Sequence, residues 1–140
     1  MGKPIVQKVS VGVCMARDGK VLLIRRSAND SFMSGLWEFP GGKREAGEPS
    51  AAAAAREAKE ETGLDVEIGQ PFFVFDYRVE KPEEIRDVTM IVFAARPENS
   101  AEVRLSAEHD AFAWVGSDEM EKHNASAETK QAMRNFWRMR

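Results

Sequence analysis

The chain has 140 residues, of which 43% are hydrophobic and 31% charged, and its formal net charge is −3. This length fits one domain spanning residues 1–140, the composition excludes a disordered or fibrous chain, and the acidic excess is unlike the basic excess of nucleic-acid binders. The single cysteine, Cys14, excludes an internal disulfide, and no apolar run approaches the ~20 residues of a membrane-spanning helix. We therefore expect a soluble, cytoplasmic protein whose partners include neither a membrane nor a nucleic-acid polymer.

The first third of the chain is predicted to form short strands. Residues 9–15 alternate in polarity and are rich in β-branched side chains, which is typical of a strand. Asp18 and Gly19 are a hairpin signal, so the aliphatic residues 21–24 are predicted to form the returning strand and to be buried on both faces. Residues 37–42 are predicted to be a short extended segment that ends in the glycine turn Gly41-Gly42.

A helix is predicted to follow this turn. Pro49 stands at the expected first helical position, where its missing N–H costs nothing. Five alanines at residues 51–55 favour a helix and allow it to lie close to a sheet. Gly63 is a typical left-handed helix stop. The sequence therefore predicts a helix that begins at Pro49 and ends at Thr62.

The remainder of the chain is predicted to contain further strands and a second helix. The strands are expected at residues 64–68, 72–79, 88–95 and 112–115, with residues 69–71 ending the first of them. Asn124 or Ser126 can cap a final helix, which runs to about residue 139 and carries one apolar stripe. Mixed strands with a central and a terminal helix place the chain in the α+β class.

Three glutamates of the central helix share one face. Glu57, Glu60 and Glu61 stand at positions i, i+3 and i+4, and like charges at this spacing cost roughly 0.2–0.5 kcal/mol per pair. A hard divalent cation is the best explanation for three converging carboxylates, and a small number of protein oxygen ligands is typical of magnesium. A solvated acidic helix face is the alternative interpretation.

The flanks of these glutamates add a second signal. Residues 42–64 resemble the Nudix box, G-x5-E-x7-R-E-U-x-E-E-x-G-U, in which U is a bulky aliphatic residue. The only departure is Ala58 at the first U position, which touches no catalytic group. The positions that match are Gly42, Glu48, Arg56, Glu57, Glu60, Glu61, Gly63 and Leu64.

The resemblance implies a Nudix hydrolase. Its fold would be an α/β/α sandwich with a mixed sheet, one central catalytic helix and a C-terminal helix. Its activity would be cleavage of a pyrophosphate bond in a small nucleotide, with Mg²⁺ as cofactor and Mn²⁺ as a possible substitute. A metal makes a bound water more acidic and takes up charge on the leaving pyrophosphate, so a carboxylate can act as the base at neutral pH.

The box also implies a role for each matching position. Glu60 and Glu61 are expected to be metal ligands, assisted by the carbonyl of Gly41. Glu57 is expected to be the general base or a further metal ligand, since the family uses this position in both ways. Arg56 is expected to act in catalysis by orienting the carboxylates. The residues expected to support this arrangement are Gly42, Glu48 and Gly63.

Segments outside the box resemble the MutT branch of the family, which removes oxidised nucleoside triphosphates. These segments are residues 35–43 and the pair Arg25-Arg26, whose planar guanidinium groups suit phosphate. By the same resemblance Glu108 would reach the metal and Asn124 would read a purine. The alternatives are a surface charge for Glu108 and a helix cap for Asn124.

Other candidates and functions stay open. His109 is expected to be a hydrogen-bonding loop residue, with a role as base as the alternative, and Tyr77 can stack on a nucleobase or belong to the core. Residues 105–114 also resemble Nudix enzymes that cut diadenosine tetraphosphate, and an ADP-ribose hydrolase is a further alternative. Substrate choice depends on loops outside the box. A catalytically silent nucleotide sensor is the alternative from another class, although such a protein has no need of Glu57.

Overall fold

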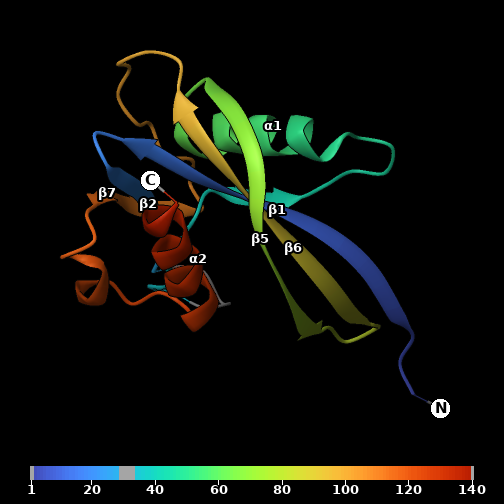
Figure 1. Cartoon of the computed structure of the whole chain (residues 1–140). Coiled ribbons are helices and arrows are strands. Elements are labelled where there is room, and N and C mark those ends of the chain that lie inside the picture. The colour runs from blue at the N-terminus through green and yellow to red at the C-terminus, as the bar shows by residue number, and fades with distance from the viewer. Residues whose placement is uncertain (1, 29–33, 140) are drawn as a thin grey trace.

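The computed structural model describes residues 2–28 and 34–139. Its strands lie in one mixed sheet, flanked by two helices, and Figure 1 labels the larger elements. The strands are β1 (Ile5–Arg17), β2 (Lys20–Arg26), β3 (Trp37–Glu38), β4 (Gly41–Lys43), β5 (Val66–Glu80), β6 (Ile85–Pro97) and β7 (His109–Val115). The helices are α1 (Ser50–Thr62), the short 3₁₀ helix η1 (Met120–Lys122) and α2 (Ala127–Arg138).

Strand β1 is the centre of the sheet. The strand order is β3-β2-β1-β6-β5, with β4 paired to β1 and β7 paired to β2. Strands β1 and β6 run parallel over Ile5–Met15 and residues 85–95, whereas the other pairs are antiparallel. Because β1 pairs with β6 along most of its length, with β4 only at residues 10–12 and with β2 only at its end, the sheet divides there into two wings.

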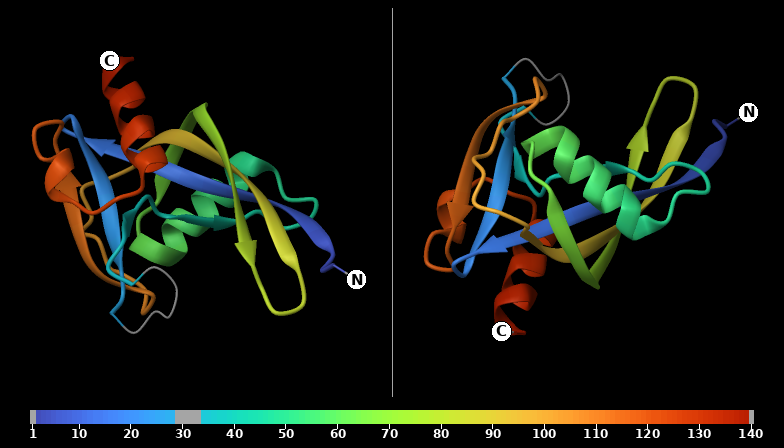
Figure 2. Two further views of the ribbon diagram at one scale, coloured as in Figure 1. Left: turned by 90° about the horizontal axis from the view of Figure 1, so that it is seen from below. Right: turned by 90° about the horizontal axis from the view of Figure 1, so that it is seen from above.

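The helices cover opposite faces of the sheet, and both panels of Figure 2 show α1 and α2 on either side of β1. Successive side chains of a strand point to opposite faces. Val13 and Met15 therefore pack in the core beneath the alanines of α1, whereas Cys14 packs with Met133 and Phe136 of α2. The expected α/β/α sandwich with a central and a C-terminal helix is confirmed. The aliphatic residues 21–24 are buried on both faces, as predicted.

The ends of the helices follow local sequence signals. Helix α1 ends at Thr62, and Gly63 takes the left-handed conformation with φ 75°. Pro49 lies at the N-cap, one residue earlier than expected. Of the two candidate caps for α2, Ser126 is the one used: its hydroxyl accepts a hydrogen bond from the N–H of Thr129 at 3.0 Å.

Some segments predicted to be turns or loops instead belong to strands. Gly41 and Gly42, predicted to form a turn, begin β4 and pair with Gly12 and Val11 of β1. Residues 69–71 do not end a strand, because β5 continues through them with register irregularities on either side of Pro71. Proline lacks a ladder donor, but it is tolerated on an edge strand or at a bulge, and β5 is the last strand of the sheet. Strand β7 begins at His109, within the segment predicted to be a loop, because its partner strand β2 extends the pairing to Arg26.

Within the described residues, no helix is long and apolar enough to cross a membrane.

Candidate active site

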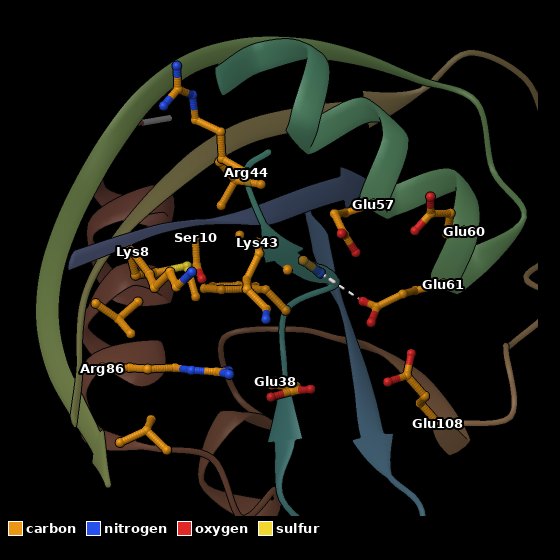
Figure 3. Close-up of a pocket in the computed structure, with 18 of the residues that line it drawn as sticks. Lys8, Ser10, Glu38, Lys43, Arg44, Glu57, Glu60, Glu61, Arg86 and Glu108 are labelled. Carbon is orange, nitrogen blue, oxygen red and sulfur yellow. Dashed lines mark hydrogen bonds between the residues drawn. The ribbon is translucent and has the colours of Figure 1, made fainter. Parts of the chain in front are cut away.

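A cleft of about 940 Å³ opens between α1 and the wing of the sheet formed by β1, β4, β5 and β6. Figure 3 shows the carboxylates of α1 along one side of this cleft and cationic side chains along the other. The residues that line the cleft come from seven separate segments of the chain. We take this cleft as the candidate active site and describe its acidic wall first.

The acidic wall is formed by the predicted face of α1. The side chain of Glu57 is 13% exposed and that of Glu60 is 56% exposed, whereas Glu61 is buried. All three line the cleft together with Glu108. Within residues 2–28 and 34–139, however, no three acidic, histidine or cysteine side chains converge closely enough to hold one metal ion. The carboxylates share a wall but do not meet at one point.

Arg56 is hydrogen-bonded to two of these carboxylates, Glu57 and Glu60. Its guanidinium donates to both carboxylate oxygens of Glu48, at 2.8 and 3.0 Å, and to Glu57 at 3.0 Å. The same group donates to Glu60 at 3.3 Å and to the carbonyl of Lys43 at 3.0 Å. One arginine thus ties the start of the box, the glycine turn and the acidic face into one network. The hydrogen bonds from Arg56 lower the pKa of Glu48 to about 2.

Gly41 and Gly42 allow the glutamates of the acidic wall to lie close to the sheet. The N–H of Gly41 donates to Oε1 of Glu61 at 2.8 Å, the bond drawn as a dashed line in Figure 3. A Cβ at position 41 would overlap the carbonyl oxygen of Val11, and one at position 42 would lie 2.5 Å from Cδ of Glu57. Glycine at position 42 leaves room for the carboxylate of Glu57, and glycine at position 41 leaves room for the backbone of Val11. The proposed ligand role of the Gly41 carbonyl stays a prediction.

Burial changes the acidity of this wall. Loss of solvation raises the pKa of Glu61 to about 7, and the hydrogen bond from Gly41 opposes only part of that shift. Loss of solvation also raises the pKa of Glu57, against the opposing effect of Arg56. An anionic pair in this environment is costly unless a cation accompanies it. Hard oxygen donors with a surplus of negative charge are a donor set that fits a divalent cation.

The cationic wall was not predicted from the sequence. Lys8 of β1, Lys43 of β4 and Arg86 of β6 line the cleft opposite the glutamates, as Figure 3 shows. Lys8 and Lys43 form no ion pair with any other residue that the structure describes, whereas Arg86 donates to Glu84 at 2.7 Å. The pairing of β1 with both β4 and β6 places these three cations on one sheet face.

An apolar floor lies among these cations. It consists of Tyr77 and Val79 of β5 and of Val88 and Met90 of β6, on the same sheet face as Lys8. The ring of Tyr77 is 37% exposed, so it is available for contact with a ligand. Only the register of four strands, β1, β4, β5 and β6, could have revealed this floor and its cations, because the sequence of each strand alone has the pattern of an ordinary half-buried strand.

The remaining predicted residues fall into two groups. Arg26, Glu108 and His109 line the cleft. Arg25 and Asn124 are not among the lining residues: Arg25 donates to Asp110 at 2.8 Å, and the carbonyl of Asn124 accepts from the backbone N–H of Trp37 at 2.9 Å. Their substrate-binding roles therefore stay predictions.

Glu38 is a cleft residue that the sequence did not single out. It projects from the short strand β3, and its two oxygens accept hydrogen bonds from Nε of Arg26 at 3.2 Å and from Nε2 of His109 at 2.9 Å. Figure 3 shows it below the glycine turn, between the two walls. The clue available in the sequence was its position next to the glycine turn.

Comparison with known proteins gives a consistent result. A family model described as NUDIX domain matches residues 6–136. A MutT-like protein from Streptomyces ambofaciens is 36% identical over 123 residues, which cover 87% of this chain and 72% of the relative. A CTP pyrophosphohydrolase from Escherichia coli K12 is 32% identical over 109 residues, covering 78% and 76% of the two chains.

One further relative is much longer than this chain. A protein from Myxococcus xanthus named octanoyltransferase is 40% identical over 121 residues, but the match covers 80% of this chain and only 31% of that protein. Among solved structures, a MutT protein from Methanosarcina mazei Go1 superposes with a TM-score of 0.73 at 30% identity, covering 99% and 97% of the two chains. A MutT Nudix hydrolase from Burkholderia pseudomallei gives a TM-score of 0.77 at 28% identity, covering 92% and 97%.

Proposed function

Because the chain belongs to the Nudix family and is a MutT-like hydrolase of pyrophosphate bonds, we propose that it converts a nucleoside triphosphate to a monophosphate and pyrophosphate with the aid of Mg²⁺. The observation that carries this proposal is the division of the cleft into an acidic wall, a cationic wall and an apolar floor. A nucleoside triphosphate has a matching division: a flat base, a chain of anionic phosphates, and an anhydride bond that needs charge compensation.

The acidic wall is the place for the metal. Glu57, Glu60, Glu61 and Glu108 would hold it, with the carbonyl of Gly41, and the raised pKa values of Glu57 and Glu61 support a wall that requires a cation. When bound, a divalent cation makes water more acidic and stabilises the charge that develops on the leaving phosphate. Glu57, Glu60 and Glu61 already line the same cleft.

Glu57 is our candidate for the general base. Its side chain is largely buried and lies against Gly42. Burial raises its pKa toward the range in which a carboxylate accepts a proton effectively. Arg56 holds one of its oxygens at 3.0 Å and thereby orients the other. The network from Glu48 through Arg56 thus limits the motion of the base.

The opposite side of the cleft would bind the substrate. Lys8, Lys43 and Arg86 supply positive charge for the phosphates, and positioning with charge stabilisation accounts for most of the catalysis in phosphoryl-type transfer. Tyr77 and the aliphatic residues around it provide a surface for stacking a base, since nucleobases pack well on aromatic and apolar groups.

The choice among nucleotides is part of the proposal. Relatives named 8-oxo-dGTP diphosphatase, from Proteus vulgaris, and asymmetrical bis(5'-nucleosyl)-tetraphosphatase, from Sus scrofa, are 41% and 37% identical over 58 and 91 residues. We favour a nucleoside triphosphate, oxidised or not. The diadenosine polyphosphate, ADP-ribose and silent-sensor alternatives are outcomes of the test below.

The test is a nucleotide panel in labelled water. The purified chain is incubated with Mg²⁺ and dGTP, 8-oxo-dGTP, CTP, diadenosine tetraphosphate or ADP-ribose in H₂¹⁸O, and the products are identified by mass spectrometry. We expect a monophosphate and pyrophosphate from a triphosphate, with the label in pyrophosphate, which means attack at the β-phosphorus. Label in the monophosphate would mean attack at the α-phosphorus. Free phosphate as the first product would contradict the proposal, and nucleotide binding without turnover would indicate a sensor.

The metal is tested separately. Excess chelator is expected to abolish turnover while the melting temperature measured by circular dichroism stays constant or falls only slightly, because the two cores do not depend on the acidic wall. Added Mg²⁺ or Mn²⁺ should restore turnover. Full activity in excess chelator would remove the metal from the mechanism.

A further inference from the structure

His109 is a buried histidine at the start of β7, beside the acidic wall. Its side chain is 2% exposed, and its Nε2 lies 2.9 Å from Oε2 of Glu38. The other oxygen of Glu38 accepts from Arg26, and the Glu38 side chain is 24% exposed and lines the cleft. Glu38 is therefore held from two sides while it faces the space in which a ligand would lie.

The direction of this hydrogen bond follows from the chemistry of its partners. A carboxylate only accepts, so Nε2 of His109 must carry the proton that it donates to Glu38. In the neutral ring Nδ1 is then an acceptor, and this atom is buried without a partner among the described residues. The hydroxyl of Ser106, a potential donor three residues earlier in the same turn, is buried without a partner as well. Buried polar atoms are seldom left unsatisfied, and a rotated hydroxyl or one buried water can join such a pair.

The backbone fixes where the ring of His109 lies. Its N–H donates to the carbonyl of Ser106, and the N–H of Ser106 donates to the carbonyl of Glu61 at the end of α1. His109 also pairs with Arg26 of β2, beyond an irregularity in the register at Arg25/Arg26. These backbone hydrogen bonds connect His109 to the end of α1. The strand pairing connects it to β2, which carries Arg26, the other hydrogen-bond partner of Glu38.

This burial argues against a direct catalytic role for His109. The ring nitrogen that faces the cleft is occupied by Glu38, and the other nitrogen is enclosed by protein. Neither nitrogen offers a free lone pair to a water molecule in the cleft. The ring can still act through Glu38.

We propose that His109 is a positioning residue that fixes the carboxylate of Glu38 in the cleft, with the free acceptor positions of that carboxylate directed at hydrogen-bond donors of the substrate. A carboxylate has about four acceptor sites. Arg26 and His109 occupy one on each oxygen, so each oxygen keeps acceptor capacity for a nucleobase N–H or a ribose hydroxyl. This inference rests on the proposed function, because it assigns the bound group to a nucleotide.

A pair of variants separates positioning from general stability. His109→Gln keeps an amide donor near the place of Nε2, whereas His109→Asn places its amide near Nδ1 and leaves Glu38 without this donor. We expect the Asn variant to raise KM for CTP and for 8-oxo-dGTP ~10-fold with kcat within ~3-fold of the wild type, which is the scale of one charge-assisted hydrogen bond. The Gln variant should keep KM within ~3-fold. Equal losses in both variants, tracking their melting temperatures, would overturn the proposal.

A double-mutant cycle then tests the link to Glu38. In a Glu38→Ala background, His109→Asn is expected to change KM by less than ~2-fold, because the group that it positions is absent. If the two substitutions act independently, so that their effects on KM multiply, His109 does not act through Glu38 and the proposal fails.

A spectroscopic measurement decides the same point without any substrate. In ¹⁵N-labelled protein, the Nε2–H proton of His109 should give a resonance that exchanges slowly with water in the wild type and is lost in Glu38→Ala. A ring protonated only at Nδ1 in the wild type would contradict the proposal. A chain that hydrolyses none of the nucleotides would refute the proposed function, and this resonance would still report whether His109 holds Glu38.

Discussion

At the scale of single residues, the acidic wall balances burial against charge. Glu61 is buried with one hydrogen bond from Gly41, and Glu57 is largely buried with one from Arg56. Both carboxyls have a raised pKa because loss of solvation outweighs these bonds. Such groups reduce stability when they are ionised, and residues with this property cluster at functional sites. Activity and stability should therefore respond in opposite directions when the charge is removed.

The first prediction concerns Glu57. Replacement by Gln is expected to lower kcat at least ~100-fold, the scale for loss of a general base. The melting temperature should stay constant or rise, because a partly buried like charge leaves the wall. Steady-state kinetics and thermal melts measure both, with the exposed Glu67→Gln as the matched control. Near-normal turnover would exclude Glu57 from the mechanism.

The second prediction concerns Gly42, which lies against Glu57, the proposed general base. Gly42→Ala places a Cβ 2.5 Å from Cδ of Glu57, which must swing away. Because the end of a flexible side chain moves, we expect the fold to persist, with a melting temperature close to that of the wild type, while kcat falls ~10-fold or more. Gly2→Ala, where nothing lies within 4 Å of the added Cβ, is the control. An unchanged kcat would show that turnover does not require the carboxylate of Glu57 to stay in its place next to residue 42.

At the scale of the elements, short-range signals determine the helix boundaries. Gly63 ends α1 in the left-handed conformation, and Ser126 begins α2 with a side-chain cap. Asn124, the other predicted cap, instead joins the segment before α2 to β3 through its backbone carbonyl. The side chain of Asn124 is therefore not required for the stability of α2.

The third prediction uses this difference. Ser126→Ala removes the acceptor for the N–H of Thr129 and is expected to lower the free energy of unfolding by about 1 kcal/mol. Asn124→Ala is the matched control and should change it by less than ~0.5 kcal/mol. Urea denaturation measures both. A larger loss in Asn124→Ala than in Ser126→Ala would reverse the assignment of the cap.

The proposed base-reading role of Asn124 can be examined with the same variant. Selectivity between 8-oxo-dGTP and CTP should fall in Asn124→Ala if its amide reads a base edge, since an unpaired edge costs discrimination.

At the scale of the whole molecule, the fold holds two charged walls apart. One core lies under α1 and another under α2, and the cleft opens between α1 and the wing of the sheet formed by β1, β4, β5 and β6. The acidic wall belongs to the helix, whereas the cationic wall belongs to the sheet. The two walls thus come from different elements of the fold, and the stability of the whole chain includes the cost of keeping them in place.

The fourth prediction is the pH dependence of that stability without metal. The pKa of Glu61 is about 7 in the folded chain against an ordinary value of 4.5, so between these values the folded chain holds a proton that the unfolded chain has released. The free energy of unfolding should therefore fall as the pH rises from about 4.5 through about 7. The pKa of His109 is also raised in the folded chain, so this residue likewise makes the free energy of unfolding fall as the pH rises.

Thermal melts in excess chelator between pH 5 and pH 8 test this expectation. The wild type should lose more stability than Glu61→Gln over that range, by ~1–3 kcal/mol, since only the wild type loses the proton of Glu61. Parallel curves for the two proteins would show that Glu61 titrates at its ordinary value in the folded chain.

Much of the local structure could be predicted from the sequence. The helix α1, its glutamate face and its glycine stop depend on spacing and on residues within one or two turns of each other, so no tertiary information was needed. The burial of residues 21–24 followed in the same way from a continuous aliphatic run. The strand boundaries at residues 69–71 and at His109 were missed because strand length depends on the partner strand, which can lie far away in the sequence.

The sequence by itself determined that Glu57, Glu60 and Glu61 share one face of a helix, because helix geometry is local. Only the tertiary structure decided what stands opposite them. The pairing of β1 with β4 and β6 brought Lys8, Lys43 and Arg86 to one sheet face, and the pairing of β2 with both β3 and β7 brought His109 to Glu38. Strand registers join residues separated by up to 94 positions in this chain, as in the pair Val21 and Val115. The side-chain pattern of one strand carries no information about which distant strand will lie beside it, so these parts of the site became visible only in the folded molecule.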